Sequence, residues 1–180
     1  SLLKTDKDFR NFVISRALFL CSVLSAPFFV ILAQQQSNSS NYLLGLFILA
    51  GGCADFFSSI IWGKLSDKSS KKAMIRGATI TSILGFLVYF LDTFYENIFS
   101  TIWIMPLIYF ALTIGYQGIR IGRKTYLIDL AGGNKRTDYV AVSNSIIGFV
   151  LLFTGFIGVL SSIIGLNGII LLLAIIGCIG

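Results

Sequence analysis

Residues 42–72 read YLLGLFILAGGCADFFSSIIWGKLSDKSSKK. From Tyr42 to Trp62 the only charged residue is Asp55, whereas the next ten residues contain four lysines and one aspartate. A helix of roughly 20 apolar residues crosses the ~30 Å hydrocarbon core of a bilayer. The strict in–out alternation of a membrane β-strand is absent. The segment therefore predicts a membrane-spanning helix that leads into a short basic loop.

The composition of the whole chain agrees with this prediction. Of the 180 residues, 56% are apolar and 12% are charged, whereas soluble domains carry roughly 25% charged residues. This composition excludes intrinsic disorder and a disulfide-rich secreted module. The chain has no histidine, which excludes histidine-based metal sites, general bases and catalytic triads. The three cysteines lie far apart in apolar stretches, so we interpret them as packing residues and expect no metal and no cofactor: Cys21, Cys53 and Cys178.

Five more apolar stretches are long enough to cross a bilayer. Because a spanning helix satisfies its backbone hydrogen bonds internally, we predict an all-α integral membrane protein, a bundle of six transmembrane helices. The predicted spans are 12–33, 42–62, 73–91, 98–122, 139–160 and 163–180. Gly115, Gly118 and Gly122 recur every three or four residues, so one face of the fourth span is expected to pack closely against a neighbour. Since the chain begins at Ser1 and stops at Gly180 within an apolar run, we expect it to be a fragment of a longer chain.

The connections between the spans differ sharply in charge. The segment 34–41 is uncharged and 92–97 carries only acidic charges, whereas all fourteen lysines and arginines lie within 4–16, 64–76 and 120–136. Cytoplasmic loops of membrane proteins collect Lys and Arg, and Trp marks the membrane interface. We therefore expect the basic loops to be cytoplasmic, in the plasma (inner) membrane, and interpret Trp62 as an interfacial anchor. The net charge of +6 follows from this topology and does not indicate nucleic-acid binding.

The basic loop after the second span carries a pattern of glycine, aspartate and lysine. Its residues are Gly63, Asp67, Lys68, Lys71 and Lys72. This pattern resembles the signature loop of the major facilitator superfamily, with Ser70 where the family usually has glycine. The resemblance implies a conformational latch, whose contacts form in one transport state and break in the other. We expect Gly63 to end the helix, Asp67 to face a helix N-terminus or an arginine, and the lysines to hold the loop at the anionic surface. A plain basic loop without a latch is the alternative.

A second stretch supports the resemblance. Tyr116 to Gly118, followed by Tyr126 to Asp129 and by Lys135-Arg136, is similar to the fourth helix of a family half and its cytoplasmic exit. The resemblance covers all six predicted spans and implies one of two six-helix halves that rock around a central site. The polar lead-in 2–10, and the absence from 143–160 of the Gly-Pro signature of family antiporters, favour the C-terminal half. The implied partners are the lipid bilayer, the other half of the same chain, a small-molecule substrate and a proton or another coupling ion.

Asp55 is the deepest charge in the predicted spans. It precedes Gly63 by eight residues, which is roughly 12 Å along a helix. A charge this deep costs about 2.5–3.5 kcal/mol on insertion scales, so a cation, a water-filled cavity or protonation must offset it. One interpretation is that Asp55 faces a transport cavity and takes part in substrate or proton coupling. The other is a structural ion pair or a carboxyl group hydrated from the cytoplasm.

Three cations follow the apolar part of the fourth span. Arg120, Arg123 and Lys124 share a helix face because they are three and four residues apart. If the helix continues to about Ala131, these cations line the cytoplasmic half of the cavity, where Arg120 and Arg123 meet an anionic substrate or pair with Asp55. The alternative is that they extend to the membrane interface.

These features together predict transport of a small solute by alternating access, as part of a major facilitator superfamily secondary transporter. We expect no covalent chemistry, so the protein is not expected to be an enzyme. A membrane-embedded enzyme is one alternative, but it needs a nucleophile, metal ligands or paired carboxylates, and Asp55 is the one deep carboxylate. A non-transporting membrane scaffold is the other, but it needs no intramembrane charge. The absence of a glycine-rich phosphate-binding loop argues against transport driven by ATP.

Overall fold

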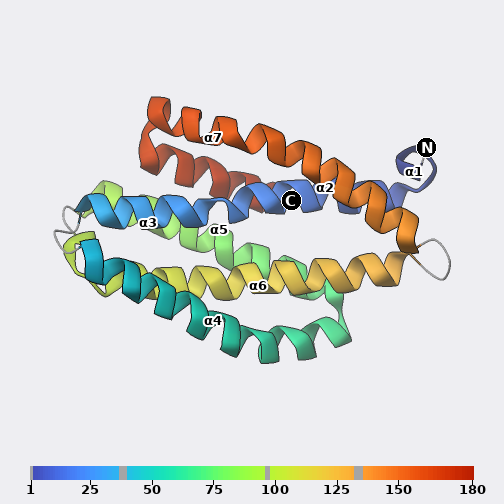
Figure 1. The fold of residues 1–180 in the computed structure, drawn as a ribbon, viewed down its shortest axis with the longest axis horizontal. Coiled ribbons are helices and arrows are strands. Elements are labelled where there is room, and N and C mark those ends of the chain that lie inside the picture. The colour runs from blue at the N-terminus through green and yellow to red at the C-terminus, as the bar shows by residue number, and fades with distance from the viewer. Residues whose placement is uncertain (1, 37–39, 96–97, 132–135) are drawn as a thin grey trace.

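The computed structural model of the chain describes residues 2–36, 40–95, 98–131 and 136–180 (Figure 1). Within these ranges the chain is helical and forms no β-strand, which confirms the predicted all-α class. The elements are α1 Leu2–Thr5, α2 Lys7–Val23, α3 Ser25–Gln36, α4 Ser40–Lys68, α5 Ser70–Phe94, the short 3₁₀-helix η1 Ile98–Ser100, α6 Ile104–Leu130 and α7 Arg136–Ile179.

Five helical stretches are long and apolar enough to cross a membrane, as expected of a multi-pass membrane protein. They are Lys7–Gln36, Tyr42–Lys68, Ser70–Phe94, Ile104–Leu130 and Arg136–Ile179. The shortest has 25 residues, which is roughly 38 Å of helix and exceeds the ~30 Å apolar core of a bilayer. The first stretch joins α2 and α3 across a break at Leu24. Pro27 follows this break, and a proline ring disturbs the helical turn that precedes it.

The fifth and sixth predicted spans are two parts of α7. This helix has 44 residues, and its backbone leaves the helical region at Gly165 (φ 78°, ψ 167°). Such a conformation is essentially restricted to glycine. In Figure 1 the orange part of α7 ends at this turn, and the red part runs back along the bundle. The predicted spans 139–160 and 163–180 therefore lie on the two arms of α7, and the turn at Gly165 falls inside the second of them. The described residues contain five candidate spans, with α7 counted as one, and not the six predicted.

The fourth predicted span, 98–122, has the wrong boundaries. Residues 98–100 form η1, and α6 begins only at Ile104. Pro106 lies in the first turn of α6, where backbone N–H groups have no partner within the helix. The N–H that proline lacks therefore costs no hydrogen bond here. At its other end α6 continues to Leu130, so Arg120 and Arg123 belong to the helix. This length meets the condition under which the sequence analysis placed these cations along a cavity.

Gly63 does not end the second span, so this part of the loop prediction is wrong. Helix α4 continues through Gly63 to Lys68. The break falls at Ser69, whose extended backbone and side-chain oxygen cap the N-terminus of α5 by accepting a hydrogen bond from the backbone N–H of Lys72. Serine is a favoured residue at this position because it satisfies an otherwise unpaired N–H. A serine cap, and not glycine flexibility, therefore separates the two helices.

Helices α5 and α6 pack at close range through glycines, as predicted for the fourth span. A Cβ atom added to Gly77 of α5 would lie 2.5 Å from the carbonyl oxygen of Gly115, and one added to Gly122 would lie 2.8 Å from the carbonyl oxygen of Ser70. Gly118 instead faces α4, where a Cβ atom would meet the indole ring of Trp62 at 2.8 Å. Small residues permit such contacts between membrane helices.

Trp62 is not an interfacial anchor, contrary to its interpretation from the sequence. Its side chain is 4% exposed, and its Nε1–H donates a hydrogen bond to the carbonyl oxygen of Ile114 at 2.8 Å. The ring lies between α4 and α6 because Gly118 leaves room for it. A buried indole needs a partner for its N–H, and the α6 backbone supplies one.

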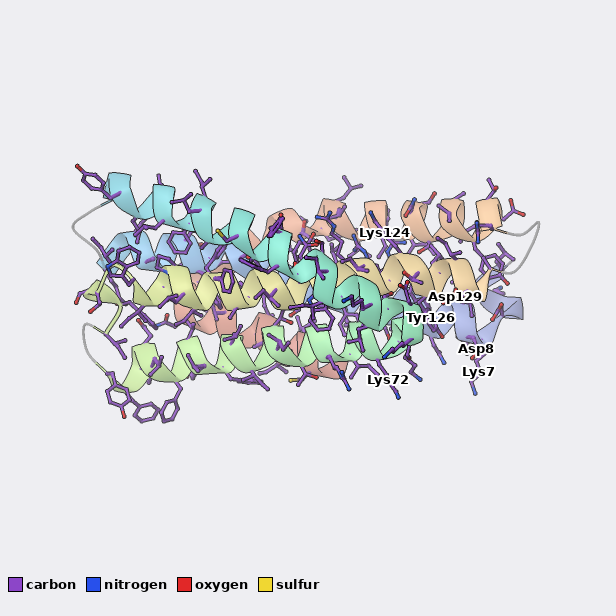
Figure 2. All side chains as sticks on the ribbon, turned by 90° about the horizontal axis from the view of Figure 1, so that it is seen from below. Lys7, Asp8, Lys72, Lys124, Tyr126 and Asp129 are labelled. Atoms are coloured by element: carbon purple, nitrogen blue, oxygen red, sulfur yellow. The ribbon has the colours of Figure 1, made fainter. Side chains whose placement is uncertain are left out.

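Polar contacts tie the helices together at the two ends of the bundle. At one end, Ser70 donates a hydrogen bond to Asp129 (3.1 Å) and Tyr139 donates one to Asp6 (2.6 Å). At the other end, Gln36 and Asn167 both donate to the carboxylate of Asp92. In Figure 2 the labelled cations Lys7 and Lys72 lie toward the first end. Basic residues are confined to a few segments of the chain, and these labelled members lie toward one end of the folded bundle.

Candidate functional site

Asp55 lies near the middle of α4, and its partner comes from α6. Its carboxylate accepts a hydrogen bond from Nε2 of Gln117. The Asp55 side chain is exposed on the surface of the bundle, whereas Gln117 is 5% exposed. An ion pair of Asp55 with Arg120 or Arg123 is not formed among the described residues. The carboxyl group is therefore oriented by a neutral amide from α6.

The sequence analysis included Gln117 in the stretch Tyr116 to Gly118 that carries the resemblance, but it gave this residue no role of its own. It is an amide within a largely apolar stretch of α6, and it stands beside Gly118, which receives Trp62. The packing of Trp62 brings α4 close to α6, and the long Gln117 side chain then reaches Asp55. An amide inside a membrane span needs a partner, so the sequence marks Gln117 as a polar residue of the span but does not show that its partner is Asp55.

Arg123 and Lys124 line a cavity between α2, α6 and α7, together with Arg16. The cavity has a volume of about 300 Å³. Its remaining lining residues are Leu127, Ile128, Val140 and Asn144. Arg123 is half-buried and Lys124 is exposed. Arg123 therefore lines a cavity of the bundle, whereas Arg120 is exposed and is not among the residues that line it.

Arg16 is the second residue whose importance the sequence analysis missed. The sequence analysis counted it only among the basic residues of the segment 4–16. In the structure its guanidinium group donates to Ser143 Oγ at 2.5 Å and to Asn144 Oδ1 at 2.9 Å, both in α7. Arg16 and Arg123 are close enough to interact as like charges. Tertiary packing of α2, α6 and α7 thus brings together cations that are more than 100 residues apart in sequence.

The loop motif is split between two helices and a serine cap. Asp67 and Lys68 are exposed in the last turn of α4, and Lys71 and Lys72 are exposed in the first turn of α5. The helix junction is fixed by its neighbouring serines, which are buried against α6. The Ser66 hydroxyl donates a hydrogen bond to Thr125 at 3.0 Å. The Ser70 hydroxyl donates one to Asp129, a contact that the glycine usual at this position of the signature loop could not make.

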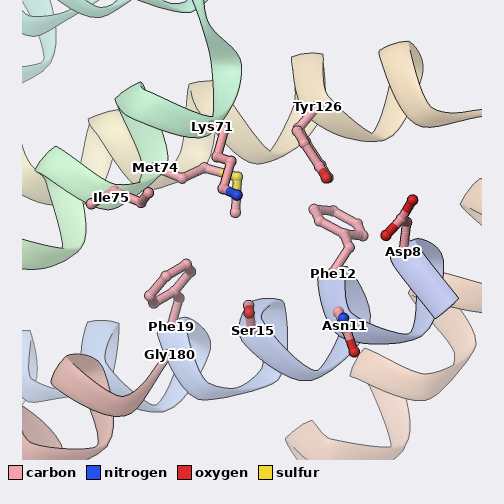
Figure 3. A pocket seen from close by; sticks show the side chains of 10 residues that line it. All are labelled: Asp8, Asn11, Phe12, Ser15, Phe19, Lys71, Met74, Ile75, Tyr126 and Gly180. Carbon is pink, nitrogen blue, oxygen red and sulfur yellow. The ribbon is translucent and has the colours of Figure 1, made fainter.

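Lys71 also lines a second cavity, which opens at the basic end of the bundle between α2, α5 and α6. Its volume is about 240 Å³, and its polar lining residues besides Lys71 are Asp8, Asn11, Ser15 and Tyr126. Figure 3 shows the rings of Phe12 and Tyr126 next to each other on one side of this cavity, with centroids 5.3 Å apart. The motif lysine therefore lies at a cavity between helices whose lining combines polar side chains with the apolar side chains of Phe12, Phe19, Met74 and Ile75.

The described residues contain no group of three or more His, Cys, Asp or Glu side chains placed to hold a metal ion. Comparison of the chain with protein-family models, with curated proteins and with solved structures finds no match. The functional assignment therefore rests on the residues and contacts described above.

Proposed function

We propose that this chain is one six-helix half of a major facilitator superfamily secondary transporter, which moves a small solute across the plasma (inner) membrane by alternating access. The observation that carries the proposal is the presence of charged and polar side chains along the apolar helices of the bundle. Asp55 with Gln117 lies on α4 and α6, and Arg16 lies with Arg123 on a cavity wall. A charge at the centre of a span costs about 2.5–3.5 kcal/mol, and Asp55 lies near the middle of α4. A water-filled transport pathway offsets this cost, and a scaffold has no use for it.

The position of the cations supports an orientation for the bundle. The starts of α2 and α5 and the ends of α4 and α6 carry the lysines and arginines and meet at one end. By the preference of Lys and Arg for the cytoplasmic side, this end is cytoplasmic. The opposite end, where Asp92 joins α3, α5 and α7, then faces outward.

The exposed motif residues fit the proposed latch. Among the described residues Asp67 forms no hydrogen bond and no ion pair, and its side chain is exposed beside Lys68. A carboxylate and several ammonium groups at a helix junction are suited to contacts that form and break. In the proposal these contacts are made with the other half of the transporter when the cytoplasmic side is closed.

A cysteine-accessibility experiment tests alternating access without knowledge of the substrate. Ser59 is exposed one turn beyond Asp55 on the same face of α4. In the full-length protein, with Cys21, Cys53 and Cys178 replaced by alanine, Ser59→Cys is treated with a membrane-impermeant maleimide from each side of sealed vesicles. Alternating access predicts labelling from both sides. Controls with Lys7→Cys and Gln35→Cys should each react from one side only, and from opposite sides.

Labelling of Ser59→Cys from one side alone, or from neither, contradicts the transporter proposal. The result for the two control positions is read separately. If both controls react from the same side, the up–down topology is wrong. If they react from opposite sides while Ser59→Cys stays unreactive, the topology holds and the chain is better described as a membrane scaffold.

A further inference from the structure

The cavity between α2, α6 and α7 combines three cations without a carboxylate. Its lining residues are Arg16, Arg123, Lys124, Leu127, Ile128, Val140 and Asn144. Lysines and arginines in a membrane bundle ordinarily pair with acidic side chains or face water. The two arginines instead line the same cavity from different helices, Arg16 from α2 and Arg123 from α6. The local charge is therefore positive and is not neutralised by the wall of the cavity.

The Arg16 side chain is held in place but keeps an unused donor. Its two Nη groups donate to Ser143 and Asn144, which are neutral and leave the charge of the guanidinium group intact. Ser143 is fully buried, so this contact fixes the guanidinium against α7. The Nε–H of Arg16 is buried and has no hydrogen-bond partner among the described residues. A buried donor without a partner is costly, so the position of this side chain is set by its contacts with α7 and by the cavity beside it.

From these contacts we propose that the cavity binds the phosphate or carboxylate group of a small organic anion, and that this anion is the transported solute. Guanidinium groups pair with the oxygens of both groups through charge-assisted hydrogen bonds. Leu127, Ile128 and Val140 provide an apolar wall for the carbon part of the ligand. A volume of about 300 Å³ lies at the lower end of the range for small-molecule sites. The inference rests on the proposed transport function and adds the substrate class to it.

The binding test uses the purified full-length protein in a neutral detergent at physiological ionic strength. Isothermal titration with inorganic phosphate and with succinate is carried out on the unmodified protein, on Arg123→Gln and on Lys7→Gln. Lys7 is exposed at the start of α2 and lines neither cavity described above, so Lys7→Gln is a control with the same change of charge. We expect at least one of the two anions to bind, Arg123→Gln to weaken that binding about tenfold or more, and Lys7→Gln to change it less than about twofold.

Arg123→Gln is the informative variant because none of the described hydrogen bonds of the protein uses the Arg123 side chain. Arg16→Gln is measured as well, but it also removes the contacts with α7. Melting temperatures of both variants are compared with that of the unmodified protein. If neither anion binds, or if Lys7→Gln loses as much affinity as Arg123→Gln, the anion site is overturned.

A second arm separates a transported solute from a lipid headgroup, which carries the same phosphate chemistry. The titrations are repeated in nanodiscs of phosphatidylcholine and in nanodiscs that also contain phosphatidylglycerol. If the anion binds equally in both, the site serves a soluble ligand, whereas loss of binding with phosphatidylglycerol assigns the cavity to lipid and overturns the transport role. Saturable transport of an uncharged solute that is unaffected by Arg123→Gln would overturn the substrate class and leave the proposed transporter intact.

Discussion

Substitution of Gly77 by alanine tests the close backbone contact between α5 and α6. The added Cβ atom would lie 2.5 Å from the carbonyl oxygen of Gly115 and 2.7 Å from the backbone nitrogen of Ile119. Cβ atoms essentially never approach other heavy atoms closer than 3.0 Å. Both neighbours are backbone atoms of α6, so no side-chain rotation relieves the contact. Helices α5 and α6 must therefore separate to accept the methyl group.

The expected loss of stability follows from comparison with a matched glycine. Overpacking of this kind costs about 1–3 kcal/mol, but alanine also favours a helix over glycine by up to about 1 kcal/mol. Gly148→Ala in α7 isolates the second effect, because nothing lies within 4 Å of a Cβ atom there. The difference between Gly77→Ala and Gly148→Ala should be about 1–3 kcal/mol, or roughly 2–12 °C in melting temperature for a chain of this length.

Thermal unfolding in detergent provides the assay. The half-buried thiol of Cys21 reports unfolding by its reaction with a thiol-specific dye, after the exposed Cys53 and Cys178 are replaced by serine. Gly77→Ala should expose Cys21 at a lower temperature than Gly148→Ala. If the two variants have the same melting temperature, α5 and α6 do not pack as closely as described, and the close contact through glycine is refuted.

Three further outcomes are expected. Gly165→Ala should lose about 1–3 kcal/mol because its backbone conformation is nearly restricted to glycine, whereas Gly158→Ala, in open helical surroundings, should lose nothing; equal melting in the dye assay would contradict the turn in α7. Tyr139→Phe removes a 2.6 Å hydrogen bond to the Asp6 carboxylate that caps α2, and should lower the free energy of unfolding by about 1–3 kcal/mol. Tyr42 is exposed, so Tyr42→Phe should lower it by less than about 0.5 kcal/mol. Asp55→Asn keeps an acceptor for the α6 amide, so its melting temperature should not change while the pH dependence of solute uptake disappears; an unaltered pH profile would exclude a coupling role.

Much of the fold was predictable because lipid restricts the choices of a chain. The long apolar stretches around Asp55 predicted helices, and five helical stretches of sufficient length are present. Boundaries were less predictable, since hydropathy marks the apolar part of a helix and not its capping residue. Helix α4 therefore extends past Gly63, and α6 begins after residues 98–100, which the sequence analysis had assigned to the fourth span.

The candidate site was predicted only in part. Asp55 and Arg123 stand out in the sequence because a charged residue in an apolar stretch carries a free-energy cost in the membrane. Such a residue can be recognised without a structure. Their partners are not visible in this way. Gln117 donates a hydrogen bond to Asp55, and Arg16 lines the same cavity as Arg123. In both pairs the two residues come from different helices, and their separation in sequence does not predict that they are neighbours.

The order of apolar and basic segments determined the secondary structure class and the sidedness of the charges, because every backbone group in lipid needs an internal hydrogen bond and because lysine and arginine cross a bilayer poorly. Tertiary packing decided which side chains meet. Gly118 admits the Trp62 ring and brings α4 against α6, so a neutral amide and not an arginine reaches Asp55. That outcome depends on the fit of surfaces from distant segments, and such a fit is a property of the folded bundle alone.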